Sequence, residues 1–134
     1  MDHEELTQKI IGCAMTVHRT LGPGLLESVY QNALAHELRI CGLGVECEKK
    51  IKVNYDGIVV GDFSADMLVE STVLIENKAV QFLAPAHEVQ LVNYLTATGI
   101  DVGLLLNFGS PRMEFNRKSR LYEKKQTGFT GSTG

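Results

Sequence analysis

The chain has 134 residues, of which 44% are hydrophobic and 22% charged, and its formal net charge is −3. This length suits one domain with one substantial core, and the composition is ordinary for a soluble globular protein. The charge gives no argument for nucleic acid, no apolar run is long enough to cross a bilayer, and the N-terminus lacks a signal-peptide pattern. Three scattered cysteines argue against a disulfide framework and against a zinc or iron–sulfur site, so we expect a cytoplasmic protein.

Two amphipathic helices are predicted at the start of the chain, over about residues 4–21 and 25–40. Hydrophobic residues recur there at helical spacing, and Gly22-Pro23-Gly24 separates the two segments because proline bars continuation of a helix. The stripes are Leu6, Ile10, Ala14, Val17 and Leu21 in the first helix, and Leu26, Tyr30, Leu34 and Leu38 in the second.

Three strands are predicted next, over residues 45–55, 58–67 and 73–78. Hydrophobic residues alternate along the first, with one solvated face, and Asp56-Gly57 is a strong signal for a two-residue hairpin turn. A polar turn around Ser71 separates the second strand from the third. The three strands therefore form an antiparallel meander.

The turn around Ser71 brings charged residues together. Paired positions in an antiparallel ladder have a constant sum, so a turn centred on Ser71 places Asp66 opposite Glu76. Lys78 lies on the same face as Glu76, because alternate strand residues share a face. Two carboxylates beside a lysine could form a salt-bridged hairpin or bind Mg²⁺.

Glu27 lies in the first turn of the second predicted helix, next to its apolar stripe. A glutamate there could simply complement the helix dipole. It could also supply a third carboxylate to the site formed by Asp66 and Glu76. Spacing alone leaves both explanations open.

A third helix is predicted between Pro85 and Gly99, residues that suit a helix start and a position just after a helix end. Val89, Val92 and Leu95 give its helical spacing, and Gln90 and Tyr94 share one face. A buried strand over residues 101–108 follows, so the helix is a crossover between parallel strands. A short edge strand is expected over residues 113–115.

The segment from Arg112 to Lys125 carries six basic and two acidic residues, which leaves −7 on the rest of the chain. It is either a solvated terminal segment or a phosphate-binding arm on an acidic body. The candidate phosphate contacts are Arg117, Lys118 and Arg120. We expect one folded domain over residues 1–125 and a disordered, low-complexity tail over residues 126–134.

Three motifs in chain order resemble a known family. Gly24-Leu25-Leu26-Glu27-Ser28-Val29-Tyr30 resembles the signature of the GxxExxY proteins, which are placed in the PD-(D/E)XK nuclease superfamily. Asp66 followed by Glu76-Asn77-Lys78 resembles the catalytic motif of that superfamily. Gln90-Leu91-Val92-Asn93-Tyr94 resembles the QxxxY helix of its RecB-like exonuclease branch. The likeness extends over about residues 5–120.

The resemblance implies a role for each matching residue. Asp66 and Glu76 would hold Mg²⁺ or Mn²⁺, with the backbone carbonyl of Asn77 as a further ligand. Glu27 would add a carboxylate directly or through water. Lys78 would position the attacking water and help to deprotonate it. The substrate-orienting residues would be Gln90 and Tyr94. Ala65 stands where the motif has proline, and the ligand itself, Asp66, is unaffected.

The leading prediction is a metal-dependent nuclease that hydrolyses phosphodiester bonds, with DNA preferred over RNA through the resemblance alone. Its fold would be α/β, with a restriction-endonuclease-like core: a central mixed sheet, made of the meander plus a strand after a crossover helix, flanked by helices. The alternative is a non-catalytic nucleic-acid or protein interaction module that keeps the fold. We also expect a homodimer, formed through the first helix or the last strand edge, and a possible protein partner for targeting.

Overall fold

The computed structural model describes residues 1–120, which fold into three helices and one five-stranded sheet. The predicted segments all form, and their bounds shift by no more than two residues except in the last strand. The predicted tail over residues 126–134, with Lys124 and Lys125 before it, lies outside the described residues. In chain order the elements are α1 (His3–Leu21), α2 (Glu27–Ile40), β1 (Val45–Tyr55), β2 (Ile58–Val69), β3 (Val73–Lys78), α3 (Pro85–Thr98), β4 (Val102–Asn107) and β5 (Glu114–Ser119).

The sheet is mixed, in the order β1-β2-β3-β4-β5. The expected antiparallel meander is made by β1, β2 and β3, and α3 then crosses over so that β4 runs parallel to β3. β5 adds an antiparallel edge beyond β4. The predicted α/β architecture is therefore confirmed. In the described part of the chain, no helix is both long and apolar enough to span a membrane.

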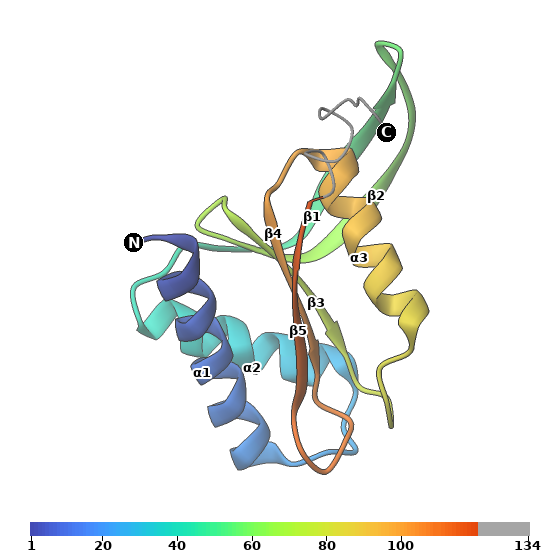
Figure 1. The fold of residues 1–134 in the computed structure, drawn as a ribbon. Helices are drawn as coiled ribbons and strands as arrows, with labels where there is room; N and C mark the ends of the chain where they lie inside the picture. Colours follow the sequence, from blue (N-terminus) through green and yellow to red (C-terminus); the bar gives the residue numbers. More distant parts are fainter. Residues whose placement is uncertain (121–134) are drawn as a thin grey trace.

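Helices cover both faces of the sheet (Figure 1). α1 and α2 bury the larger hydrophobic cluster against β2, β3 and β4, with fully buried Tyr30 stacked on Phe108 at a ring-centroid distance of 4.9 Å. α3 covers the opposite face through Leu91 and Leu95, which pack with Leu74 and other sheet residues. The central strands β3 and β4 are thus buried on both faces, which explains their continuous apolar runs.

Two predicted helix stripes were partly wrong. Leu26 precedes α2 as its N-cap and is 74% exposed, because the helix begins one residue later than its apolar pattern suggests. On α3 the buried residues are Leu91 and Leu95, whereas Val89 is 58% exposed. α3 turns Leu91 and Leu95 toward Gly103 of β4, where the missing side chain leaves room for them.

The last strand is longer than residues 113–115 and includes Arg117 and Lys118. Charged residues therefore continue an edge strand in a segment for which the sequence left a solvated terminal segment and a phosphate-binding arm open. Four of the five residues in the predicted α1 stripe are buried in the core, with Ile10 fully inaccessible, whereas Leu21 at its end is 38% exposed. The buried part of the stripe is not free to form a dimer interface.

The β1–β2 hairpin changes direction where Glu48 and Asp66 lie. On β2, Met67 packs in the cluster beneath α1 and α2, whereas Ala65, two residues earlier, packs in the cluster beneath α3. β1 makes the same change between Cys47 and Ile51. Glu48 has φ 53° at this point, a left-handed conformation that is uncommon outside glycine. Beyond the bend the hairpin projects away from the body of the sheet (Figure 1).

Candidate active site

Asp66 and Glu76 meet where β2 and β3 separate. The β2–β3 ladder is centred on Ser71, as expected, and its last pair is Met67 with Ile75. One step further, side chains replace the backbone ladder: the Asp66 N–H donates to Glu76 Oε2 at 3.2 Å, and the Asn77 N–H donates to Asp66 Oδ2 at 2.8 Å. The two carboxylates are therefore fixed side by side by the main chain of the opposite strand.

This carboxylate pair carries more negative charge than the nearby Lys78 can offset. Glu76 is 8% exposed, and burial, with the charge of Asp66 as the next cause, raises its pKa from the ordinary 4.5 to about 7. Burial also raises the pKa of Asp66, although the Asn77 N–H and the Lys78 charge act in the opposite direction. Among residues 1–120, neither carboxylate forms an ion pair. The site therefore has excess negative charge, which a bound cation would relieve.

Glu48 is a further carboxylate at this site, and the sequence alone did not identify it. Gln31 Nε2 of α2 donates to Glu48 Oε2 at 2.7 Å, and Ser64 Oγ donates to Glu48 Oε1 at 3.2 Å. The charge of Glu48 contributes to the raised pKa of both Asp66 and Glu76. Its left-handed backbone lies between the β1–β2 pairs on either side of Asp66, so the bend in the hairpin brings Glu48 to the site.

Glu27 is the exposed first residue of α2, and its charge also raises the pKa of Asp66. The turn before it is fixed by Tyr30, whose hydroxyl donates to the Gly22 carbonyl and accepts the Leu25 N–H at 3.1 Å. Because Tyr30 is fully buried, this anchor holds the start of α2. The glutamate and tyrosine of the GxxExxY-like motif thus have linked positions, one near the carboxylates and the other holding the turn.

Lys78 and Tyr94 approach the carboxylates, but Gln90 makes no contact that ties it to them. Lys78 shares its face of β3 with Glu76, and its charge lowers the pKa of both acidic groups. Tyr94 stacks on Phe63 at 3.9 Å between ring centroids. Burial raises the pKa of Tyr94, and the charges of Glu76 and Asp66 raise it further, so the phenol lies within their field. Gln90 is exposed on α3.

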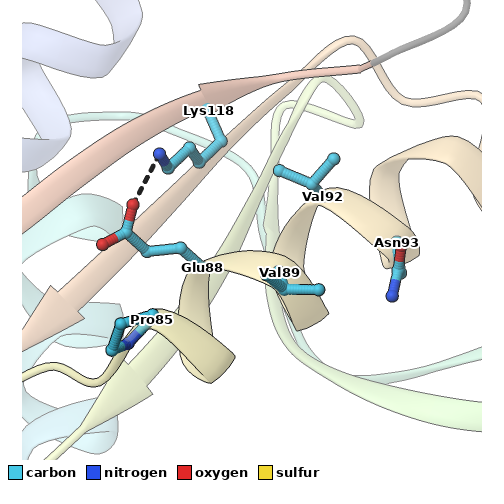
Figure 2. A pocket seen from close by; sticks show the side chains of 6 residues that line it. All are labelled: Pro85, Glu88, Val89, Val92, Asn93 and Lys118. Carbon is cyan, nitrogen blue, oxygen red and sulfur yellow. Dashed lines mark ion pairs between the residues drawn. The ribbon is translucent and has the colours of Figure 1, made fainter.

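Of the basic residues predicted to contact phosphates, Arg117 and Lys118 lie on β5 and Arg120 directly follows it. Lys118 is paired with Glu88 at 2.6 Å, and Arg120 with Asp101 at 2.5 Å. Arg117 is exposed and points to the opposite face from Lys118, because the two alternate along the strand. The Glu88–Lys118 ion pair lies at an open groove of about 400 Å³ between α3 and β5 (Figure 2). The groove is lined by Pro85, Glu88, Val89, Val92, Asn93 and Lys118, so it is separate from the carboxylate site.

The donor set of the carboxylate site fits a hard divalent cation. Within residues 1–120, no group of three or more His, Cys, Asp or Glu side chains is arranged to hold a metal ion. Asp66 and Glu76 therefore form a two-carboxylate site, and Asn77 brings a backbone carbonyl next to them. Mg²⁺ is commonly bound by one or two carboxylates while keeping several waters or taking substrate phosphates. Two carboxylates without an ion-pair partner match that pattern.

A mixed five-stranded sheet flanked by helices is consistent with a restriction-endonuclease-like fold. The model of the PD-(D/E)XK nuclease superfamily matches residues 4–118. The chain belongs to that superfamily.

A solved structure titled "Crystal structure of SSO0001" is similar, with a TM-score of 0.54 and 19% identity. The match covers 70% of this chain and 50% of that one, so the present chain spans about half the length of that protein. At this identity the likeness supports the fold alone. A search of curated proteins finds no match.

Proposed function

We propose that this protein is a metal-dependent nuclease that hydrolyses phosphodiester bonds, with DNA as its substrate. The observation that carries the proposal is the Asp66–Glu76 pair beside Lys78: Glu76 is buried, Asp66 is half-buried, and neither forms an ion pair among residues 1–120. A purely structural cluster would be expected to contain its own counter-ion, because an uncompensated buried charge is costly. Membership of the PD-(D/E)XK superfamily supports nuclease chemistry.

The proposed roles follow the positions of the side chains. Asp66 and Glu76 hold Mg²⁺ or Mn²⁺ together with the Asn77 carbonyl, and Glu27 supports the site from the start of α2. Such a cation lowers the pKa of water and offsets the charge that develops on the phosphate. Lys78 orients the attacking water and helps to deprotonate it. Tyr94 and Gln90 orient the scissile phosphate from α3.

Three finer features belong to the same proposal. The motif around Glu27 and Tyr30 resembles the GxxExxY signature and supports membership of that group as part of the proposal. Arg117 and Lys118 on β5, and Arg120 directly after it, offer phosphate contacts, for which Lys118 and Arg120 must first leave their ion pairs. A homodimer forms through the free edge of β5, since most of the α1 stripe is buried, and a protein partner directs the enzyme to its target.

The test is incubation of purified protein with single-stranded, duplex and branched DNA, and with RNA, in Mn²⁺ and in chelator. We expect metal-dependent cleavage of DNA by the wild type and none by Asp66→Asn or Glu76→Gln. The exposed Glu46→Gln variant is the matched control and should cleave normally. Binding of Mg²⁺ or Mn²⁺ should raise the melting temperature of the wild type by mass action. A protein that binds DNA but neither cleaves it nor responds to metal would be the alternative, an interaction module that keeps the fold. Light scattering tests the homodimer.

A further inference from the structure

The end of the β1–β2 hairpin, residues 49–63, projects from the sheet and is here called the arm (Figure 1). Large hydrophobic residues are exposed at its tip: Tyr55 is 72% exposed, Ile58 64%, Val59 51% and Val60 60%. Isolated exposed hydrophobic side chains are ordinary, but a cluster of this kind marks a contact surface. The tip of the arm is therefore a candidate contact surface for a binding partner.

One face of the arm is packed and the other is open. Ile51 and Phe63 pack with the cluster beneath α3, which fixes the root of the arm. Lys50 and Lys52 alternate with Ile51, are exposed, and so point to the opposite face. Within residues 1–120 neither lysine forms an ion pair, although Asp62 stands opposite Lys52 in the ladder.

The open face leads to the carboxylate site. Ser64 pairs with Lys50 across the hairpin, and its hydroxyl donates to Glu48 at 3.2 Å. Glu48 in turn faces Asp66, because it lies between the ladder pairs Cys47–Met67 and Lys49–Ala65. The exposed Lys50 and Lys52 thus lie on the face of the arm that extends from the carboxylate site.

We propose that the arm grips the nucleic-acid substrate: Lys50 and Lys52 contact its phosphates, and Tyr55 and Ile58 insert against its bases. The inference rests on the proposed function for the chemistry at the root of the arm and deepens it by naming the surface that holds the substrate. Lysines neutralise phosphates, and apolar or aromatic side chains wedge between bases or stack on them. By strand alternation Tyr55, and Ile58 opposite it in the ladder, share the face of Ile51. Lys50 and Lys52 lie on the other face, so the nucleic acid is proposed to contact both faces of the projecting hairpin.

A second copy of the chain or another protein fits the tip less well. A stable protein interface buries about 800 Å² on each partner, whereas the tip offers four side chains at the end of a two-stranded hairpin. An apolar protein contact would also leave Lys50 and Lys52 without a partner. The nucleic acid accounts for both the charged face and the apolar tip.

The test measures binding of a fluorescently labelled 20-base-pair DNA duplex and of a 20-nucleotide single strand, by anisotropy, in chelator. Two variants of the arm, Lys50→Ala/Lys52→Ala and Tyr55→Ser/Ile58→Ser, are compared with wild type over a salt series. Lys9→Ala on α1 and Ile40→Ser at the end of α2 are the matched controls, since Lys9 is exposed and Ile40 is 67% exposed. Circular dichroism melts verify that each variant folds.

For duplex DNA, we expect the lysine variant to lower the slope of log affinity against log salt by about 1.8, or about 0.9 for each phosphate that the protein no longer neutralises. The tip variant should bind about tenfold or more weakly with an unchanged salt slope, because it removes base contacts alone. Both controls should bind as the wild type does. Both arm variants should keep the rise in melting temperature that Mn²⁺ produces, since the carboxylates are intact.

Three results would refute the proposal that the arm binds the nucleic acid. The first is wild-type affinity and salt slope in both arm variants. The second is equal weakening by the controls. The third is a dimer, measured by light scattering, that Tyr55→Ser/Ile58→Ser converts to a monomer without affecting DNA binding. Because DNA binding is measured in chelator, it tests the role of the arm independently of catalysis. Failure of the nuclease proposal would instead appear as a wild type that neither cleaves nor responds to Mn²⁺.

Discussion

Replacing Glu76 with glutamine tests the electrostatic description of the site. Burial and the charge of Asp66 raise the pKa of Glu76 from 4.5 to about 7, and the residue is only 8% exposed. Glutamine has nearly the same shape, and its amide oxygen can still accept the Asp66 N–H that Glu76 Oε2 accepts at 3.2 Å. The substitution therefore removes one buried charge and preserves the local hydrogen bond.

The sign of the effect follows from proton linkage. Between pH 4.5 and about 7 the native Glu76 keeps a proton that the unfolded chain has released, so the free energy of unfolding falls as the pH rises across this window. The rise in pKa from 4.5 to about 7 corresponds to a loss of about 3 kcal/mol in the free energy of unfolding, and this loss is complete above pH 7. In chelator, we expect Glu76→Gln to be more stable than wild type by about 1–3 kcal/mol at pH 8, and equally stable at pH 4.5.

The assay is urea denaturation of wild type and Glu76→Gln in chelator at pH 4.5 and pH 8, with Glu46→Gln as the control. Glu46 forms an exposed ion pair with Lys49 at 3.2 Å, so its variant should change stability by less than about 1 kcal/mol at pH 8. Destabilisation of Glu76→Gln by several kcal/mol at pH 8 would refute the reasoning. That result is expected if Glu76 were one partner of a buried ion pair.

Three other substitutions separate catalysis from folding. Lys78→Ala should abolish cleavage of DNA yet retain the thermal shift with Mn²⁺, because Lys78 is proposed to act on the water and not on the cation; loss of the shift would contradict this. Tyr30→Phe should destabilise the protein by roughly 1–3 kcal/mol in urea melts, since buried groups of the turn before α2 lose their partner. Gly103→Ala should destabilise it by roughly 1–3 kcal/mol, because a Cβ there would meet Leu91 Cδ1 at 2.9 Å and Leu95 Cδ2 at 3.2 Å; an unchanged urea midpoint would mean that α3 can move away from β4.

Local patterns were sufficient to predict the elements and the register of the β2–β3 hairpin. The turn around Ser71 has no bulge, so a constant sum correctly placed Asp66 next to Glu76. Helix periodicity was less reliable at the ends of helices. Leu26 matched the spacing of its stripe but precedes the first turn of α2, and it is exposed. Periodicity describes a repeating face, whereas the cap depends on where the backbone leaves the helix.

Glu48 could not be placed from the sequence because the register between β1 and β2 shifts at Val60, an extra residue on β2. A two-residue turn at Asp56-Gly57 places Asp66 opposite Cys47. The observed ladder shifts by one residue between Val53 and Asn54, so the pairs on either side are Cys47 with Met67 and Lys49 with Ala65. This single bulge moves Glu48, with its carboxylate, to the position facing Asp66. Nothing in the local composition of β1 signals it.

β5 was underestimated for a different reason. An edge strand is covered only partly, so its exposed positions can be charged, and Arg117 and Lys118 hide the alternation that marks a strand. The partners of Lys118 and Arg120 lie on α3 and before β4, far along the chain, and only the folded structure brings Glu88 and Asp101 to them. The run of basic residues therefore identified Arg117, Lys118 and Arg120, but it could not show that Lys118 and Arg120 already form ion pairs.

The bend in the β1–β2 hairpin connects the carboxylate site with the arm. Glu48 adopts a left-handed conformation, which costs a non-glycine residue roughly 1–2 kcal/mol. The hydrogen bonds from Gln31 and Ser64 hold its side chain in place, so this strain persists in the native structure. The same bend turns Ala65 toward α3 while Met67 remains beneath α2, and it thereby directs the arm away from the sheet. A straight hairpin would leave Glu48 away from the site and the arm without its present direction, so the strained backbone serves both the proposed chemistry and the proposed grip on the substrate.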